Sequence, residues 1–451
     1  MAPGYISGSN IVNLFTWKVY HVDEFYPMLN YIFYGNKLWY PPSNSTNSEA
    51  KTIVAIVVPV SIAILLFIVG FYMARRSRKK YDAIIATIGT SEISITESLQ
   101  YNLTDIQATT NNFAIGNKIG EGGFGPVYKG TLHNGQEIAV KRLSRSSAQG
   151  TKEFKNEITP VARLKHRNLV RLLGFCLERE ERILIYEFIT NKSPDYCLFD
   201  LEKQPLSNWS KRYKVIGGIA KGLLYLHEDS RLRIIHCDLK ASNVLLDRNM
   251  NPKIADFGLA RLFEVDKTEG NTSKIEGTFG YMAPEYALHG LFSVKSDVFS
   301  FGVLALEILS GKKNSQFYQA HRGDDLSNQF HYHHLQYMLQ DWSQWRDGTP
   351  LALIDPTIGD TYARNEVIQS IHIGLLCVQD KIEQRPTMAS VVLMLNSYSV
   401  TLPAPNPPAY FGQSGIQSLL NNLPEFDASS GTKFLPSSSM NEVSITELYP
   451  R

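Results

Sequence analysis

The chain has 451 residues, of which 43% are apolar and 20% are charged, and this composition is typical of a globular protein with two to four domains. Its formal net charge is only +2, which excludes a nucleic-acid-binding protein that relies on bulk electrostatic attraction. The cysteines Cys176, Cys197, Cys237 and Cys377 form no close pair, so their spacing indicates neither a zinc site nor a disulfide framework.

The first clear element is an uncharged run over 53–74 (IVAIVVPVSIAILLFIVGFYMA). A helix over this run would reach about 33 Å, enough to cross the hydrocarbon core of a bilayer. Five basic residues follow within 75–80, whereas the first fifty residues hold only Lys18 and Lys37. The asymmetry predicts one transmembrane helix with its C-terminal side in the cytosol. Residues 1–52 are then a short extracellular segment.

Residues 75–112 read as a juxtamembrane segment with a short helix at 105–112. From residue 113 to about residue 185 the patterns are mainly those of strands, at 127–129, 137–142 and 183–187. One helix interrupts them at 151–165, because Phe154, Ile158 and Val161 share one helical face. This part of the chain is predicted to form a small β-rich lobe.

From about residue 207 the apolar residues recur mostly at helical spacing. Helices are predicted over 213–227, 367–377 and 390–395. The two regions together predict an α+β fold with two lobes over residues 113–395. Residues 396–451 are rich in Ser, Pro and Asn, and this composition predicts a disordered C-terminal tail.

A glycine-rich motif opens the β-rich lobe, with Gly120, Gly122 and Gly125 followed by Val127. Glycines let backbone N–H groups approach phosphate oxygens closely, because no Cβ stands in the way. A dinucleotide-binding fold would require a helix directly after the last glycine. A strand is predicted there instead, which favours a flap made of strand, loop and strand.

A lysine follows on the next predicted strand, and an acidic residue on the predicted helix after it. The Lys141 ammonium can bridge two phosphate oxygens of a nucleotide, and Glu157 can pair with Lys141 and hold it extended. A lysine in a strand is usually a solvated edge residue. The glycine motif upstream and Glu157 downstream favour the phosphate interpretation.

Two acidic motifs complete the candidate site. In the first, over 236–243, Asp238 can accept a hydroxyl proton, Lys240 can neutralise phosphate charge and Asn243 can hold a metal ion. In the second, Asp256 precedes Phe257 and Gly258 and can bind Mg²⁺ that bridges the phosphates of a nucleotide. Phosphoryl transfer needs mainly positioning and charge neutralisation. This ordered set predicts phosphoryl transfer.

Glu285, Arg385 and Asp297, which end the set, are interpreted as structural. Glu285, in the sequence Ala-Pro-Glu at 283–285, is expected to form a buried ion pair with Arg385. Asp297 is expected to anchor the backbone of the loop that carries Asp238. Thr278 is either a phosphorylation site or a structural residue whose hydroxyl bonds near Asp238.

At these residues the sequence resembles the eukaryotic protein kinases. The sequences CLE at 176–178, YEF at 186–188, GNTS at 270–273 and NEVSITEL at 441–448 resemble plant cysteine-rich receptor-like protein kinases, over about residues 91–451. The resemblance implies a bilobal kinase fold, ATP with Mg²⁺ and transfer to Ser or Thr hydroxyls of protein substrates. It also implies a single-pass protein of the plasma membrane with a cytoplasmic kinase domain, acting in signal transduction with partner receptor kinases and without nucleic acid.

The resemblance also assigns roles to individual residues. Tyr186 is the expected gatekeeper, and residues 187–189 are the expected hinge beside adenine. Expected catalytic residues are Asp238, Lys240 and Asn243, and expected metal ligands are Asn243 and Asp256. The expected nucleotide-binding residues are Ile119, Gly120, Gly122, Gly125, Val127, Lys141, Glu157, Glu187 and Ile189.

The sequence departs from the family at several places. Residues 1–50 contain no cysteine, so the cysteine-bearing ectodomain repeats are expected to be absent or truncated. Cys237 stands where the resemblance implies an arginine that grips a phosphate on the activation segment, and we interpret it as a passive thiol. Pro160 follows Glu157 in the predicted helix, where a kink could misplace that carboxylate. Glu276 places a carboxylate where an apolar residue is expected.

An apparent insertion over 328–340 (NQFHYHHLQYMLQ) contains three close histidines at 331, 333 and 334. Without a fourth ligand, a polar loop is favoured over a metal site.

Two functions of different classes remain open. The first is an active Ser/Thr kinase, which is favoured because every group expected to touch phosphate or metal is intact. The alternative is a nucleotide-binding pseudokinase that acts as a membrane scaffold, which Cys237, Pro160 and the missing repeats suggest. An adhesion protein that works through residues 1–50 has almost no support.

Overall fold

The computed structural model describes residues 57–72, 99–123, 125–144, 148–161, 164–199, 208–263, 269–313, 341–359, 362–397 and 400–408. The chain divides into two units, Met1–Arg76 and Ser77–Arg451. In the first unit the described residues 57–72 form a helix whose side chains are all exposed. Within the described ranges, no helix is both long and apolar enough to cross a membrane. The predicted span over 53–74 extends past the described helix at both ends.

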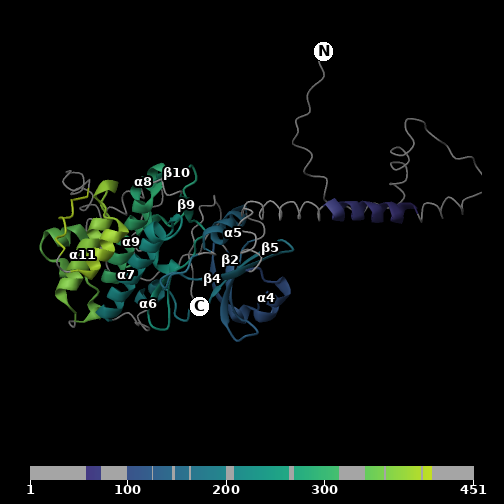
Figure 1. Ribbon diagram of the computed structural model, residues 1–451, viewed down its shortest axis with the longest axis horizontal. Coiled ribbons are helices and arrows are strands. Elements are labelled where there is room, and N and C mark those ends of the chain that lie inside the picture. Colours follow the sequence, from purple (N-terminus) through teal and green to yellow (C-terminus); the bar gives the residue numbers. More distant parts are fainter. Residues whose placement is uncertain are drawn as a thin grey trace, which may run out of the picture. The chain divides into compact units, whose positions relative to one another are not determined.

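The second unit contains a β-rich lobe and a helical lobe (Figure 1). The β-rich lobe is built on an antiparallel five-stranded sheet with the order β1-β2-β3-β5-β4. The three strands predicted from sequence lie within β2, β3 and β5, and the structure adds β1 and β4. The bounds are β1 Lys118–Gly122, β2 Gly125–Thr131, β3 Glu137–Arg142, β4 Leu172–Glu178 and β5 Glu181–Glu187.

Helices pack on both faces of this sheet because alternate residues of a strand point to opposite faces. On β5, Ile183 and Ile185 belong to a small apolar cluster that includes residues of helix α4 (Leu103–Thr109). Leu184 and Tyr186 belong instead to the main core, together with Phe154 of helix α5 (Ala148–Val161). The sheet is thus buried on both sides, with α4 on one face and α5 on the other.

Helix α4 shows that the packed lobe includes residues placed in the juxtamembrane segment by the sequence. Its Leu103 and Ile106 are buried, and the Tyr101 N–H donates to the carbonyl of Phe175 on β4 (2.8 Å). A Cβ at Gly174 would lie 2.3 Å from the carbonyl oxygen of Leu99, so only glycine allows this approach. The fold of the lobe therefore begins ahead of residue 113.

Helix α5 contains the predicted apolar positions Phe154 and Ile158, which are buried. The prediction that it continues to residue 165 is wrong, because the helix ends at Val161 and residues 164–166 are not helical. The end comes one residue after Pro160, which has no N–H to bond the carbonyl of Asn156 and so weakens the last turn.

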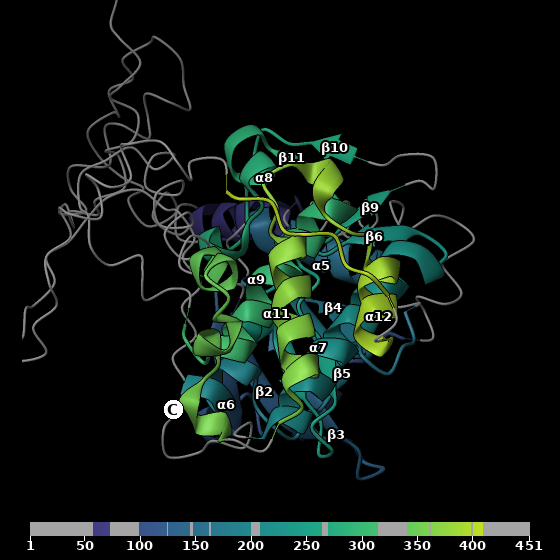
Figure 2. The same cartoon turned by 90° about the vertical axis from the view of Figure 1, so that its left-hand side faces the viewer.

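The helical lobe is organised around α9 (Val294–Ser310), which is buried on every side except at its first turn. Helix α9 packs against α11 (Arg364–Cys377) and α7 (Trp209–Leu224), and α7 packs against α12 (Met388–Asn396) (Figure 2). The predicted helices correspond to α7, α11 and α12. The shorter helices α6 and α8 span Pro194–Phe199 and Pro284–His289.

Short strand pairs pack against the helices of the helical lobe. β6 (Arg233–Ile235) pairs with β9 (Arg261–Phe263), and β7 (Val244–Leu246) pairs with β8 (Pro252–Ile254). A third pair, β10 (Glu269–Asn271) with β11 (Leu291–Ser293), follows them. The loops that carry residues 236–243 and 255–260 are thus each bounded by strands.

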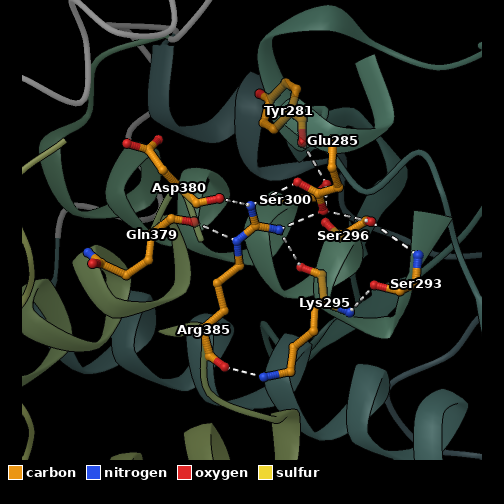
Figure 3. A network of polar contacts seen from close by, with 9 residues as sticks. All are labelled: Tyr281, Glu285, Ser293, Lys295, Ser296, Ser300, Gln379, Asp380 and Arg385. Carbon is orange, nitrogen blue, oxygen red and sulfur yellow. Dashed lines mark hydrogen bonds and ion pairs between the residues drawn. The ribbon is translucent and has the colours of Figure 1, made fainter. Parts of the chain in front are cut away.

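Figure 3 shows the buried ion pair that fastens α8 to the segment ahead of α12. The Arg385 guanidinium, which is 1% exposed, donates to both carboxylate oxygens of Glu285, at 2.7 and 2.9 Å. It also donates to the carbonyls of Gln379 (2.6 Å) and Asp380 (3.2 Å). The predicted structural pair of Glu285 and Arg385 is confirmed.

The start of the predicted disordered tail is wrong for residues 400–408. The Pro403 carbonyl lies 2.7 Å from His372 Nε2 on α11, and the Asn406 N–H donates to Gln379 Oε1 (3.1 Å). Pro405 is buried. Composition alone predicted disorder, but these contacts bind the segment to the helical lobe.

Candidate active site

The Lys141 ammonium lies between two carboxylates from different parts of the chain. Lys141 Nζ, on β3, donates to Glu157 Oε1 on α5 (2.9 Å) and to Asp256 Oδ1 (2.8 Å). Burial alone would lower the pKa of Lys141, but Asp256 and Glu157 outweigh it and raise that pKa well above its ordinary value. The ammonium is therefore charged, and it joins β3, α5 and the 256 turn.

Glu157 is held from a second side. It is completely buried, and the Tyr186 hydroxyl on β5 donates to Glu157 Oε2. Pro160 does not prevent this arrangement, because the backbone of α5 is helical through its position. The displacement of Glu157 that a kink at Pro160 could cause is not observed, because Glu157 contacts Lys141.

Asp256 has a backbone φ of 62°, a left-handed conformation that is uncommon for residues other than glycine. Burial would raise the pKa of Asp256, but Lys141 outweighs it and lowers that pKa below its ordinary value. The preceding Ala255 N–H donates to the carbonyl of Asn243 (2.8 Å). Asp256 is thus ionised. The hydrogen bond of the preceding residue, Ala255, fixes the backbone beside Asp256 against the loop that contains Asn243.

That neighbouring loop brings together the residues expected to act on the acceptor hydroxyl. Asn243 Nδ2 donates to the carbonyl of Asp238 (2.9 Å) and to its Oδ2 (3.0 Å). Lys240 Nζ lies 3.2 Å from the same Oδ2. The Thr278 hydroxyl donates to Asp238 Oδ1 and accepts from Lys240 Nζ, both at 2.8 Å. The structural interpretation of Thr278 is confirmed.

Asp297, at the start of α9, anchors the backbone of the loop over 236–243. Its Oδ2 accepts from the His236 N–H (2.7 Å), its Oδ1 accepts from the Cys237 N–H (3.0 Å), and His227 Nε2 lies 2.9 Å away. The predicted anchoring role is confirmed. Because Cys237 has a φ of 64°, these bonds also hold an unfavourable backbone conformation.

The glycine motif forms the predicted strand-loop-strand flap. Ile119, Gly120 and Gly122 lie on β1, which pairs antiparallel with β2. Gly125, at the start of β2, has a φ of 126°, and a Cβ there would lie 2.2 Å from the carbonyl oxygen of Arg142. This position therefore requires glycine. Val127 pairs directly with Lys141, so the flap is in register with the ammonium.

The expected hinge follows β5. The Glu187 carboxylate is occupied by other groups: its Oε1 accepts from the Arg171 N–H (2.9 Å) and from Lys253 Nζ (2.8 Å). Ile189 is partly buried against the main core. The backbone of this segment, rather than the Glu187 carboxylate, is therefore what a nucleotide base could meet.

Hard oxygen ligands suited to Mg²⁺ are present at two adjacent positions. Asn243 directs its amide nitrogen toward Asp238, which leaves its carbonyl oxygen as the ligand atom, and Asp256 supplies an ionised carboxylate. Mg²⁺ needs only one or two protein ligands beside phosphates and water. In the described parts of the chain, no cluster of three or more His, Cys, Asp or Glu residues could hold a metal ion. The histidines at 331, 333 and 334 lie outside these parts.

Cys237 occupies the position next to Asp238. Burial raises the pKa of its thiol well above the ordinary value, and Asp297 adds to the effect. A thiol in this state is a poor nucleophile, which supports the passive interpretation.

The sequence did not single out Glu153, one helical turn before Glu157. It is 1% exposed, and neither carboxylate oxygen has a hydrogen-bond partner among the described residues. Burial raises the pKa of Glu153 to about 8; Lys141 opposes this shift, whereas Asp256 and Glu157 add to it. The only sequence signal was its spacing of four residues from Glu157, which places both on one helical face.

The arrangement is that of a protein kinase, and the comparisons agree. The protein kinase domain family matches residues 113–394, so the chain belongs to that family. It is 54% identical over 410 residues to cysteine-rich receptor-like protein kinase 10 of Arabidopsis thaliana, covering 91% of this chain and 59% of that protein. It is 55% identical over 390 residues to cysteine-rich receptor-like protein kinase 11 of the same plant, covering 85% and 57%. The chain thus spans somewhat under two thirds of the length of these relatives.

The buried carboxyl of Glu153 predicts a measurable pH dependence. Folding raises its pKa from 4.5 to about 8, so the folded chain binds an extra proton in this window and loses stability as the pH rises. The loss is up to about 1.4 kcal/mol per pH unit. Between about pH 6 and about pH 8, the free energy of unfolding should therefore fall more for the wild type than for Glu153→Gln. The exposed control Glu228→Gln should follow the wild type, and parallel curves for all three proteins would contradict the assignment.

Proposed function

We propose that this chain is an active serine/threonine protein kinase, anchored in the plasma membrane, that transfers the γ-phosphoryl group of ATP to protein hydroxyls in signal transduction. One observation carries the proposal. Polar contacts run without a break from Lys141 to Asp256, from Ala255 to Asn243, and from Asn243 to Asp238 and Lys240. Groups that would contact phosphate, metal and acceptor thus form one connected site.

In the proposed reaction the acceptor hydroxyl attacks the γ-phosphorus, the bond to the β-phosphate oxygen breaks, and ADP leaves. Asp238 aims the hydroxyl and accepts its proton, while Thr278 and Asn243 fix the carboxylate orientation. Lys240 neutralises charge on the transferred group. Such positioning and neutralisation supply most of the catalysis in phosphoryl transfer.

For the nucleotide, Lys141 is the proposed partner of the phosphates, with Glu157 holding it in place. The glycine flap over 119–127 would cover the phosphates, and Ile119 and Val127 would contact the base and sugar side. Mg²⁺ at Asn243 and Asp256 would neutralise phosphate charge when bound. Glu187 and Ile189 are proposed at the adenine end, through the backbone between them.

Specificity for Ser and Thr over Tyr is proposed from Lys240 and Thr278. The contact between the Lys240 ammonium and the Thr278 hydroxyl (2.8 Å) places both within reach of Asp238. This arrangement keeps the acceptor close to Asp238 and suits a short hydroxyl side chain. The substrates are proteins with Ser or Thr, and partner receptor kinases are the proposed regulatory partners.

A nucleotide-binding pseudokinase remains the competing function, because Cys237 removes a cation from the loop of Asp238. The two functions differ in turnover. A pseudokinase would be stabilised against unfolding by ATP with Mg²⁺ and would transfer no phosphate, whereas the proposed kinase would do both.

Asp238→Asn tests the proposed function most directly, in an assay that follows labelled phosphate from ATP to a generic protein acceptor. Loss of the proton-accepting carboxylate should lower the rate by about 10²- to 10⁴-fold while leaving stabilisation by ATP in place. The exposed control Asp229→Asn should keep the wild-type rate. Equal transfer by Asp238→Asn would rule the assignment out.

Membrane anchoring is proposed through residues 53–74. Every side chain of the described helix over 57–72 is exposed, although most are large and apolar. Its Ser61 hydroxyl bonds within the helix, to the carbonyl of Val57 (2.7 Å). Such a helix offers an apolar surface that a bilayer would cover, it satisfies its backbone groups internally as a bilayer requires, and its Ser61 hydroxyl is also bonded within the helix.

Two charges in the middle of this run should abolish anchoring. Each arginine at the centre of a span costs about 2.5–3.5 kcal/mol, so Leu65→Arg with Ile68→Arg should release the chain from the carbonate-resistant membrane fraction. The matched variant with alanine at both positions should stay in that fraction. Retention of the arginine variant would contradict the proposed span.

A further inference from the structure

The Glu276 carboxylate lies among cations from three separate segments. Lys152 on α5 donates to Oε2 (2.7 Å), the Lys274 ammonium lies 2.5 Å from Oε1, and the Arg261 guanidinium on β9 lies 3.9 Å from Oε2. The Glu276 side chain is only 8% exposed. The carboxylate is thus largely covered, whereas its partners Lys152 and Lys274 are 38% and 65% exposed.

The backbone at Glu276 is fixed independently. The Tyr286 hydroxyl on α8 donates to the Glu276 carbonyl (2.7 Å) and accepts from the Glu276 N–H (3.1 Å). Tyr286 is itself buried. The main chain of Glu276 is therefore held by the helical lobe, while its side chain reaches α5 in the β-rich lobe.

Glu276 carries its negative charge near neutral pH. Burial alone would raise its pKa, but the hydrogen bonds from Lys152 and Lys274 outweigh burial and lower that pKa below the ordinary value. Glu153, the nearby acid on α5, is neutral near pH 7 because its pKa is raised to about 8. Glu276 is thus the ionised carboxylate that these cations share.

The ion pair with Lys152 acts on a helix that also carries a residue of the active site. Lys152 lies five residues before Glu157 on α5, a rise of about 7.5 Å along a rigid helix. A second tie reaches the same helix, because Asn156 Nδ2 donates to the carbonyl of Gly258 (2.8 Å). Movement of α5 away from the 276 segment would therefore carry Glu157 away from Lys141.

On its other side Glu276 lies two residues before Thr278, which contacts both Asp238 and Lys240. Residue 237 is a cysteine and supplies no positive charge. The described cations around Glu276 come instead from α5 (Lys152), from β9 (Arg261) and from the segment that contains Glu276 (Lys274). The cluster needs no cation from the loop of Asp238.

We propose that Glu276 is a positioning residue whose permanent carboxylate fixes α5 against the 269–283 segment. It thereby holds Glu157 on Lys141 and Thr278 on Asp238 without any phosphate added to that segment. The predicted effect of Glu276 on the rate of phosphate transfer rests on the proposed kinase function. The predicted effect of Glu276 on the position of α5 does not.

The test compares the full-length wild type with Glu276→Gln, Glu276→Asp and the exposed control Glu269→Gln, each treated with a protein phosphatase beforehand. The first measurement is backbone hydrogen exchange over 148–161. Glu276→Gln keeps the shape but loses the charge, so exchange there should speed up about tenfold. Glu276→Asp should restore part of the protection, and Glu269→Gln should match the wild type.

The second measurement is phosphate transfer by the same proteins. The phosphatase-treated wild type should keep its rate, and Glu276→Gln should lose about tenfold in kcat with a smaller change in the KM for the protein acceptor. Lys152→Met should also lower kcat, and the double variant should lose no more than Glu276→Gln alone, because Lys152 acts on the segment through the Glu276 carboxylate.

The outcomes separate the two proposals. If the wild type transfers no phosphate even before phosphatase treatment but α5 loosens in Glu276→Gln, the kinase function fails and the positioning role of Glu276 stands. Unchanged exchange over 148–161 in Glu276→Gln would overturn the positioning role. So would a wild type that loses its activity after phosphatase treatment, because the segment would then depend on a phosphate.

Discussion

A buried ammonium between two carboxylates is the constraint on which the rest of the site depends. Lys141 could not be buried alone, because removing an unpaired charge from water costs several kcal/mol. Glu157 and Asp256 compensate this cost only if β3, α5 and the 256 turn meet at one point. β3 pairs with β2 of the flap, α5 carries Glu157, and the 256 turn carries the proposed metal ligand Asp256, so one electrostatic requirement brings these elements together.

The helical lobe supplies rigid support through buried polar contacts. Asp297 holds the backbone at 236 and 237, and the Glu285–Arg385 pair fastens α8 beneath the segment that contains Thr278. Breaking one partner of such a pair leaves an uncompensated charge, which typically costs about 3–5 kcal/mol. These groups fix the loop of Asp238, while the loop residues remain available for chemistry.

The sequence predicted the two lobes and the residues of the site because these are encoded by local patterns and by their order along the chain. Helix α9 was not predicted, since it is apolar on nearly all sides and shows no helical face to recognise. Contacts between distant residues were also beyond the sequence: the docking of 400–408, and the approach of Lys152 and Arg261 to Glu276. Their partners lie far away in the chain, and no spacing reveals them.

The central claim is that Glu157 acts on the nucleotide only through Lys141, and a double-mutant cycle on the dissociation constant for ATP with Mg²⁺ tests it most directly. Lys141→Met and Glu157→Gln should each weaken binding. The double variant should bind no more weakly than Lys141→Met alone, because without the ammonium Glu157 has nothing to position. If the two losses instead add in free energy, the residues act independently and the account is contradicted.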